Sequence, residues 1–568
     1  MYLKEQKYLT YMVDGWEDLR RRSLYGSVAA QVDCFPVILS LKDCTGERGT
    51  AVNTLRTMKE SLQKMNVEDG KNFVALVTDN PTTMQSFRRM ATSPANYPWL
   101  LDFACWLHGS NNIVGEVAKF PEAKKVISKN TVIVSFFNGS HYWGGQLMDD
   151  AKTRQPRTRS LKQNCETRWY AITLQALSIE SMRYSLQAIC VRRDAQKSMK
   201  GLSAVKKEVI DAVFDDAYWI WLDQIIRVTK PIVDMIGNLE SRSCTLADCV
   251  LEAIRCGKEV AEMTAGPDES VRFLMHAKSV FNRRIAKMIT PVHVLALFLH
   301  PLCRSLAISK ATSSGYTLES LTETALGIVH KWKYKKGLSV AHQLVKDMHE
   351  YHKGKGIWAG GKADALTWWH DLAVREIEHP LKTLALILHS IVPHTAEVER
   401  LFSQLGGVQT AKRCNLSVET FESLGKCRSH YSRQQWDEDR ARGKPRHRQA
   451  AHMHTRPTAG VDADLVQQLD SEYGLCEADV DNAPDTEQFA LSELEKAFER
   501  LSIEAADTDE EEEGQEMTEG SMFDFGMLDA VARGETSSVF DEEAPIDDDS
   551  AEATWDVKSM MADLYTSV

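Results

Sequence analysis

The sequence lacks long hydrophobic runs, paired cysteine motifs and repeats of fixed period. Its most apolar stretch, residues 292–303, is too short and too interrupted to cross a bilayer. The first residues do not show the basic and then apolar pattern of an export signal. The twelve cysteines have no CxxC spacing, which is typical of free thiols in a reducing compartment. We therefore expect a soluble intracellular protein with no membrane partner, and no solenoid.

Charge is divided unevenly along the chain. The formal net charge is -12, yet residues 461–568 hold 33 acidic and only 4 basic side chains, whereas residues 1–460 hold 64 basic and 47 acidic ones. A basic body is typical of proteins that bind nucleic acid. The acidic composition after residue 440 opposes burial, so we expect most of this tail to be disordered.

The first eighty residues predict an α/β fold. Apolar and β-branched residues at 8–14, 24–34 and 35–43 predict three antiparallel strands joined by tight turns. Apolar residues spaced three and four apart at 50–65 predict a helix, and 73–79 predicts a further short strand. This order predicts a mixed sheet in which a crossover helix leads to a parallel strand.

The middle of the chain predicts an all-α region, and the end predicts two polar segments. Amphipathic runs dominate from about 175 to 380. The basic stretch at 440–448 favours a nuclear localisation signal or a phosphate-binding arm, although a solvated linker has the same composition. Mixed acidic and apolar residues at 521–531 indicate a segment that binds a protein partner.

Three acidic residues are candidates for a metal site. Asp14 is expected to end the first strand, Asp79 to end the fourth, and Glu399 to lie on a helix. Carboxylates at neighbouring strand ends can hold two divalent metal ions about 4 Å apart, as phosphoryl-transfer enzymes require. Magnesium suits such oxygen ligands. Aspartate is also common at strand ends as a turn or N-cap residue, which is the alternative interpretation.

Five sequence blocks, in this order, support the metal-site interpretation. They are VDGWEDL with Asp14, VTDNPTTM with Asp79, FACWLHGSNN with Cys105 and His108, CETRWY with Arg168 and Trp169, and HTAEVERLFSQLGG with Glu399 and Arg400. Together they resemble the transposases of the hAT superfamily over residues 8–430. Five blocks in one order are far more specific than any one of them.

The resemblance implies a domain organisation. Residues 1–174 would form the first part of a ribonuclease-H-like core with a mixed sheet, and residues 175–363 a large all-α insertion. Residues 364–432 would be the C-terminal dimerisation region that completes the core. Residues 433–568 would be a basic linker and an acidic, mostly disordered tail.

The resemblance also implies an activity. The expected function is DNA strand cleavage and transfer by two-metal phosphoryl transfer, with magnesium as cofactor and manganese as its substitute. The expected partners are DNA, a second copy of the chain in a homodimer or higher oligomer, and a protein that binds the acidic tail. The expected location is the nucleus.

The site residues follow from the matched blocks. The metal-binding triad would be Asp14, Asp79 and Glu399, and the DNA-binding residues would be Cys105, His108, Arg168, Trp169 and Arg400. A tetrahedral zinc site needs more than the two ligands that Cys105 and His108 supply. Trp169 could equally be a core residue, and Arg168 could be a surface residue or a helix-capping partner.

The chain departs from the family pattern in two ways. Pro81 stands where the family more often has alanine or glycine, which is acceptable in the first turn of a helix. Asp14 lies so close to the start that we expect no zinc-finger module before the core. A catalytically silent, dimerising nuclear regulator derived from a transposase is therefore the alternative function.

Overall fold

The computed structural model describes residues 2–154, 160–164, 168–199, 201–308, 316–332, 338–362, 364–409 and 415–443. The acidic tail and the segment at 521–531 lie outside the described residues, as does most of the basic stretch at 440–448. A linker was predicted to begin at residue 433, but the last described helix continues through this position to Ala441.

Asp14 lies within a five-stranded mixed sheet, and Asp79 directly follows one of its strands. Its strands are β1 (Leu9–Glu17), β2 (Ser23–Ala30), β3 (Val37–Asp43), β4 (Phe73–Thr78) and β5 (Leu101–Ala104), in the order β3-β2-β1-β4-β5. β1, β2 and β3 pair antiparallel, whereas β4 and β5 pair parallel to β1 and to each other. The predicted mixed α/β sheet is confirmed, and β5 is an additional strand.

The position of Asp14 in its strand differs from the prediction. Asp14 does not end β1, because the strand continues to Glu17 in register with β2. The pairing between β1 and β4 stops earlier, at Met12 and Val77. Asp14 is therefore the second residue after β1 and β4 part, and Asp79 is the first residue after β4 ends.

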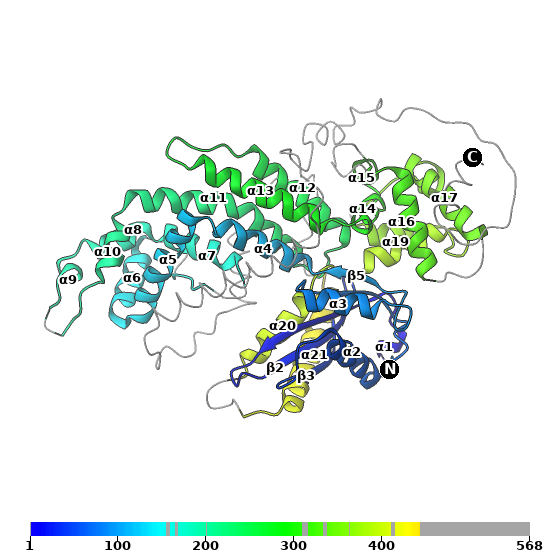
Figure 1. Ribbon diagram of the computed structural model, residues 1–568, viewed down its shortest axis with the longest axis horizontal. Coiled ribbons are helices and arrows are strands. Elements are labelled where there is room, and N and C mark those ends of the chain that lie inside the picture. Colours follow the sequence, from blue (N-terminus) through cyan, green and yellow to red (C-terminus); the bar gives the residue numbers. More distant parts are fainter. Residues whose placement is uncertain are drawn as a thin grey trace.

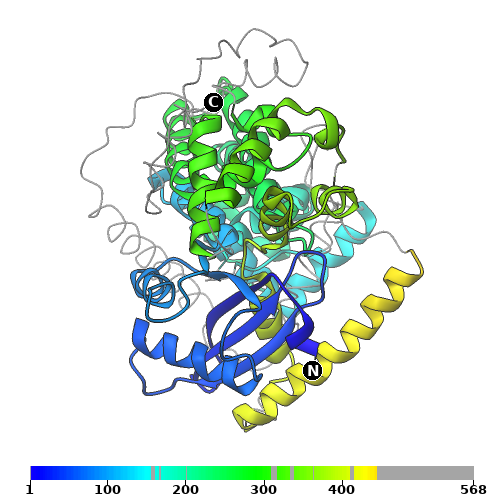
Figure 2. The same ribbon diagram turned by 90° about the vertical axis from the view of Figure 1, so that its right-hand side faces the viewer.

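Helices cover both faces of the sheet. α2 (Ala51–Lys64) and α3 (Thr82–Ala91) cover one face, and α20 (Ala396–Gly406) and α21 (Val418–Ala441) cover the other (Figure 2). Successive side chains of a strand point to opposite faces. Tyr11 accordingly packs toward α2 and Met12 toward α20, so Asp14 faces α20 as well.

A large helical body separates β5 from α20 in sequence (Figure 1). The helices of this body begin at Trp106, well before the boundary expected at residue 175. The longer helices of this body are α4 (Trp106–Ala118), α5 (Pro121–Gly139), α6 (His141–Arg154), α7 (Tyr170–Ser181), α8 (Arg183–Cys190), α11 (Asp216–Leu239), α12 (Leu246–Glu262), α13 (Val271–Met288), α14 (Pro291–Phe298), α16 (Leu318–Lys331), α17 (Leu338–Lys353) and α19 (Pro380–Ser390). The short helices of this body are α9 (Arg193–Gln196), α10 (Lys207–Val213), α15 (Arg304–Ala307) and α18 (Ala365–Asp371). A further short helix, α1 (Tyr2–Glu5), precedes the sheet.

One continuous apolar core joins the helical body to the sheet. It runs from Val77 and Phe103 on β4 and β5 to Trp369 and Leu384 on α18 and α19. Leu401 and Phe402 on α20 belong instead to the core beneath the sheet. The region after residue 364 therefore packs against both the helical body and the sheet, as expected. None of the described helices is long and apolar enough to cross a membrane.

Candidate metal centre

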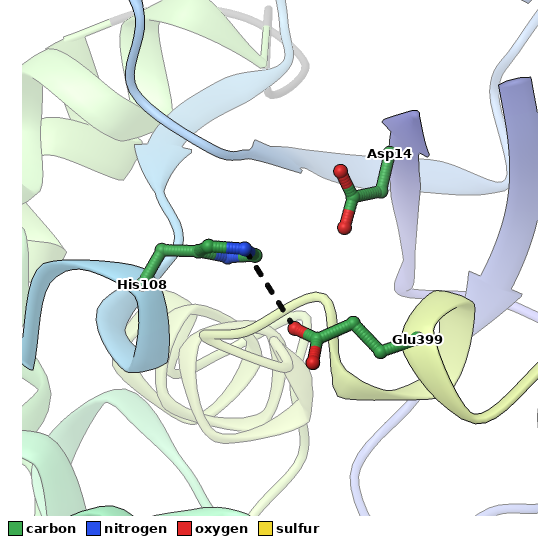
Figure 3. Close-up of side chains that lie close together, drawn as sticks. All are labelled: Asp14, His108 and Glu399. Atoms are coloured by element: carbon green, nitrogen blue, oxygen red, sulfur yellow. Dashed lines mark ion pairs between the residues drawn. The ribbon is translucent and has the colours of Figure 1, made fainter. Parts of the chain in front are cut away.

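Three side chains from distant parts of the sequence meet beside the sheet. Asp14 comes from β1, His108 from the first turns of α4, and Glu399 from the first turn of α20 (Figure 3). One ligand atom of each lies within 4.8 Å of the other two. The Nε2 atom of His108 is 3.9 Å from Oε1 of Glu399. The structure thus brings two members of the predicted triad together and adds His108.

The start of α4 is fastened to the start of α20. Cys105 is the N-cap residue of α4, and its Sγ accepts hydrogen bonds from the backbone N and Oγ1 of Thr395, both at 3.3 Å. Trp106 N donates to Pro393 O at 3.0 Å. His108 and Glu399 lie only a few residues into their helices, so these contacts hold their side chains near each other.

α20 is fastened to the helical body by a buried carboxylate. Glu397 accepts from Arg242 Nε at 2.7 Å and from its Nη2 at 3.0 Å, and it also pairs with Arg400. Burial would raise the pKa of Glu397, but Arg242 and Arg400 outweigh burial and lower it to about 2. Because a buried bidentate pair of this kind has a defined geometry, it fixes the axial position of the helix that carries Glu399.

Arg400, predicted to contact DNA, forms contacts within the protein. Besides Glu397, its Nη2 donates to Glu240 O at 2.7 Å, and its side chain is only 12% exposed. The guanidinium therefore joins α20 to the end of α11. The side chain of Cys105, also predicted to bind DNA, is buried against Thr395.

Two other predicted DNA-binding residues have different environments. Trp169 is buried in the helical core, which supports the alternative interpretation of this residue. Arg168 Nη2 donates to Glu399 Oε2 at 3.3 Å, and its side chain is 18% exposed. Arg168 therefore lies at the metal centre itself, where its guanidinium is partly open to solvent.

Asp79 lies outside the 4.8 Å cluster but interacts with it electrostatically. Burial raises the pKa of Asp79, His108 and Arg88 lower it, and Glu399 raises it further, with a net upward shift. Arg88 holds the backbone at the end of β4 in place. Its Nη1 donates to Thr78 Oγ1 at 2.6 Å and to Asp79 O at 2.7 Å. Among the described residues, the buried Oδ1 of Asp79 has no hydrogen-bond donor.

The candidate metal centre brings carboxyl groups together in a partly buried place. Burial raises the pKa of Asp14 to about 7, with Asp79 and Glu399 adding to the shift and His108 opposing it. Burial would lower the pKa of His108, yet Cys105, Glu399 and Asp14 outweigh burial and raise it. Carboxyl groups that repel one another are stabilised by a cation.

The donor set fits a divalent metal ion. Asp14 and Glu399 supply carboxylate oxygens, which magnesium and manganese prefer, and the unpaired Oδ1 of Asp79 is a further anionic oxygen beside them. The imidazole of His108 is a ligand that manganese accepts more readily than magnesium. The residues present therefore fit one such ion directly, and Asp79 is a candidate ligand for a second.

One residue of the candidate metal centre was predicted in a different role, and one residue whose pKa its carboxylates influence was not predicted. His108 was expected to contact DNA rather than metal. Tyr25 was not singled out, yet its ring lies 3.8 Å from where a Cβ on Gly15 would stand. Burial raises the pKa of Tyr25, and the charges of Asp79 and Asp14 contribute. Its signal in the sequence was the pairing of β1 with β2, which sets Tyr25 opposite Gly15.

Comparison with known proteins found no match from which a function could be inferred. No protein-family model matches the chain, and no curated protein matches it.

Proposed function

We propose that this protein is a metal-dependent DNA strand-processing enzyme of the hAT transposase type, built on a ribonuclease-H-like core. The observation that carries the proposal is the convergence of Asp14 and Glu399, from the first strand and a helix near the end of the described chain, within one 4.8 Å cluster. Asp79 follows the strand parallel to β1, at the neighbouring strand end.

The sheet supports the same proposal. Three antiparallel strands are followed by a crossover helix, and two parallel strands then extend the sheet beyond β1. A helical body enters between β5 and the helix that carries Glu399, as the resemblance implies. The order of the five blocks and the meeting of their acidic residues are independent observations that favour one function.

The residues of the centre have separate tasks in such a reaction. A divalent metal ion bound here would activate water and stabilise the leaving oxygen. Asp14 and Glu399 would hold the ion, and Arg88 would keep Asp79 at the strand end. Arg168 would contact a phosphate oxygen, since a planar guanidinium suits phosphate. Water oxygen would bond to phosphorus while the bond from phosphorus to the deoxyribose 3′ oxygen breaks, and a proton lost by the water would end on that oxygen to give a 3′ hydroxyl.

The test is strand cleavage by the full-length protein. We expect nicking of labelled DNA duplexes with magnesium or manganese, and none with a chelator. Pre-nicked and hairpin-forming substrates should be included, because cleavage of intact duplex needs target recognition in addition to chemistry. Absence of cleavage on every substrate, in protein that is folded and binds DNA, would favour the catalytically silent nuclear regulator instead.

Metal affinity should depend on pH. A ligand carboxyl must lose its proton before it binds metal, and the pKa of Asp14 is raised to about 7. We therefore expect manganese affinity, measured by calorimetry, to fall as the pH is lowered from 8 to 6, by up to about tenfold per unit below 7. Affinity that is constant over this range would contradict Asp14 as a ligand.

A further inference from the structure

The turn between β1 and β2 is tight and has an unusual residue in its last position. Arg21 N donates to Asp18 O at 2.8 Å, and Asp18 N donates to Arg22 O at 3.1 Å. Arg21 has a φ of 58°. This is a three-residue hairpin loop, whose left-handed position normally holds glycine because a Cβ strains the backbone there.

The hairpin tip is rigid despite its exposure. The carboxylate of Asp18 is buried and accepts from Arg20 N and Arg22 N, both at 2.9 Å, and from Gln409 Nε2 at 3.0 Å. Leu19 N donates to Gln409 Oε1 at 3.1 Å. Since Gln409 follows α20, the tip is fixed relative to both elements that carry the carboxylates of the metal centre.

Arg21 differs from the arginines on either side. Arg20 donates to Asn415 Oδ1 at 3.0 Å, and Arg22 pairs with Asp18 at 2.7 Å. Within the described part of the chain, the exposed side chain of Arg21 forms no hydrogen bond or ion pair. Its neighbour Leu19 is 66% exposed. The backbone strain at Arg21 is thus not offset by any described contact of its side chain, and strain of this kind points to function.

We infer that the β1–β2 hairpin tip is a contact site for the phosphate backbone of a DNA duplex beside the reacting phosphodiester. The inference rests on the proposed function. Asp18 is four positions after Asp14, which corresponds to about 13 Å at the usual rise of a strand. That length corresponds to about four base-pair steps along a duplex. A rigid tip with an unpaired guanidinium presents positive charge at this distance, and the exposed Leu19 suits the sugar surface.

The test is the substitution Arg21→Gly in the full-length protein. Glycine removes the charge and relieves the left-handed strain, so the melting temperature should be unchanged or a few °C higher. Affinity for a short labelled duplex, measured by fluorescence anisotropy, should fall about three- to tenfold at low salt, and the slope of log affinity against log salt should decrease by about one. Arg21→Lys should keep most of the affinity.

Asn66→Gly is the matched control. Asn66 is an exposed residue with a φ of 55°, so the change tests the backbone effect without a change of charge, and DNA affinity should stay the same. Wild-type affinity and salt slope in Arg21→Gly would overturn this inference alone. DNA binding that depends on Arg21, in a protein with no metal-dependent cleavage, would overturn the proposed function and keep the contact site. A wild-type protein that binds no duplex would overturn the contact site.

Discussion

Asp14→Asn should abolish metal-dependent cleavage and at the same time stabilise the metal-free protein. The amide cannot replace an anionic metal ligand, so we expect the cleavage rate to fall by at least about 100-fold. The pKa of Asp14 is raised to about 7 by burial and neighbouring carboxylates. The folded protein therefore binds a proton that the unfolded chain releases near pH 4, and the stability of the metal-free protein falls as the pH rises from 4 to 7.

Asparagine removes this cost while still accepting the hydrogen bond that Gly15 N donates to Oδ1 at 2.8 Å. At pH 8 with a chelator, we expect Asp14→Asn to be about 1–3 kcal/mol more stable than wild type, measured by denaturant unfolding. The exposed Asp69 supplies a control, because Asp69→Asn should change neither activity nor stability. An active Asp14→Asn variant would refute the metal centre.

Gly26→Ala should impair both folding and activity, although Gly26 has no side chain that could bind metal. Gly26 is the partner of Asp14 in β2, and a Cβ there would stand 2.8 Å from Phe402 Cε1 and 3.1 Å from Val398 Cγ1 on α20. Phe402 is itself stacked on Trp16, with ring centroids 5.5 Å apart, so it cannot retreat freely. Overpacking of this kind costs about 1–3 kcal/mol.

The displaced helix would carry Glu399 with it. A shift of about 1 Å at a catalytic centre can reduce a rate about 100-fold, so we expect a loss of at least tenfold in cleavage even at temperatures where the variant is folded. Gly327→Ala on α16 is the matched control, because no atom lies within 4 Å of its added Cβ. Unchanged cleavage in Gly26→Ala would show that the position of α20 is not critical.

The sheet could be predicted because its strands have a local signal. In β1 to β4, apolar and polar residues alternate or apolar residues form short runs between turn residues. These patterns depend on near neighbours in sequence. β5 has only four residues, too few for a period to emerge. The helices from Trp106 to Arg154 were not predicted from the sequence.

The metal centre could be predicted only as a set of residues and not as a geometry. The acidic residues and His108 stood in recognisable blocks, but their separation in space is decided by contacts such as those between Cys105 and Thr395. Arg400 was predicted to contact DNA because it lies in a block that resembles the family. Its partner Glu397 is a local i,i+3 neighbour, but Glu240 O, 160 residues away in sequence, is a partner that no local pattern reveals.

The ribosome makes α20 long after the sheet on which this helix packs, and this order has a consequence for the nascent protein. Val392 N, just before this helix, donates to Thr10 Oγ1 at 3.1 Å across a separation of 382 residues. At about 5–20 residues per second, a ribosome needs roughly 20 to 75 s to make the intervening chain. During that interval one apolar face of the nascent sheet lacks the helix that covers it, so this face is exposed to aggregation until synthesis reaches α20, and a chain that terminates early lacks Glu399.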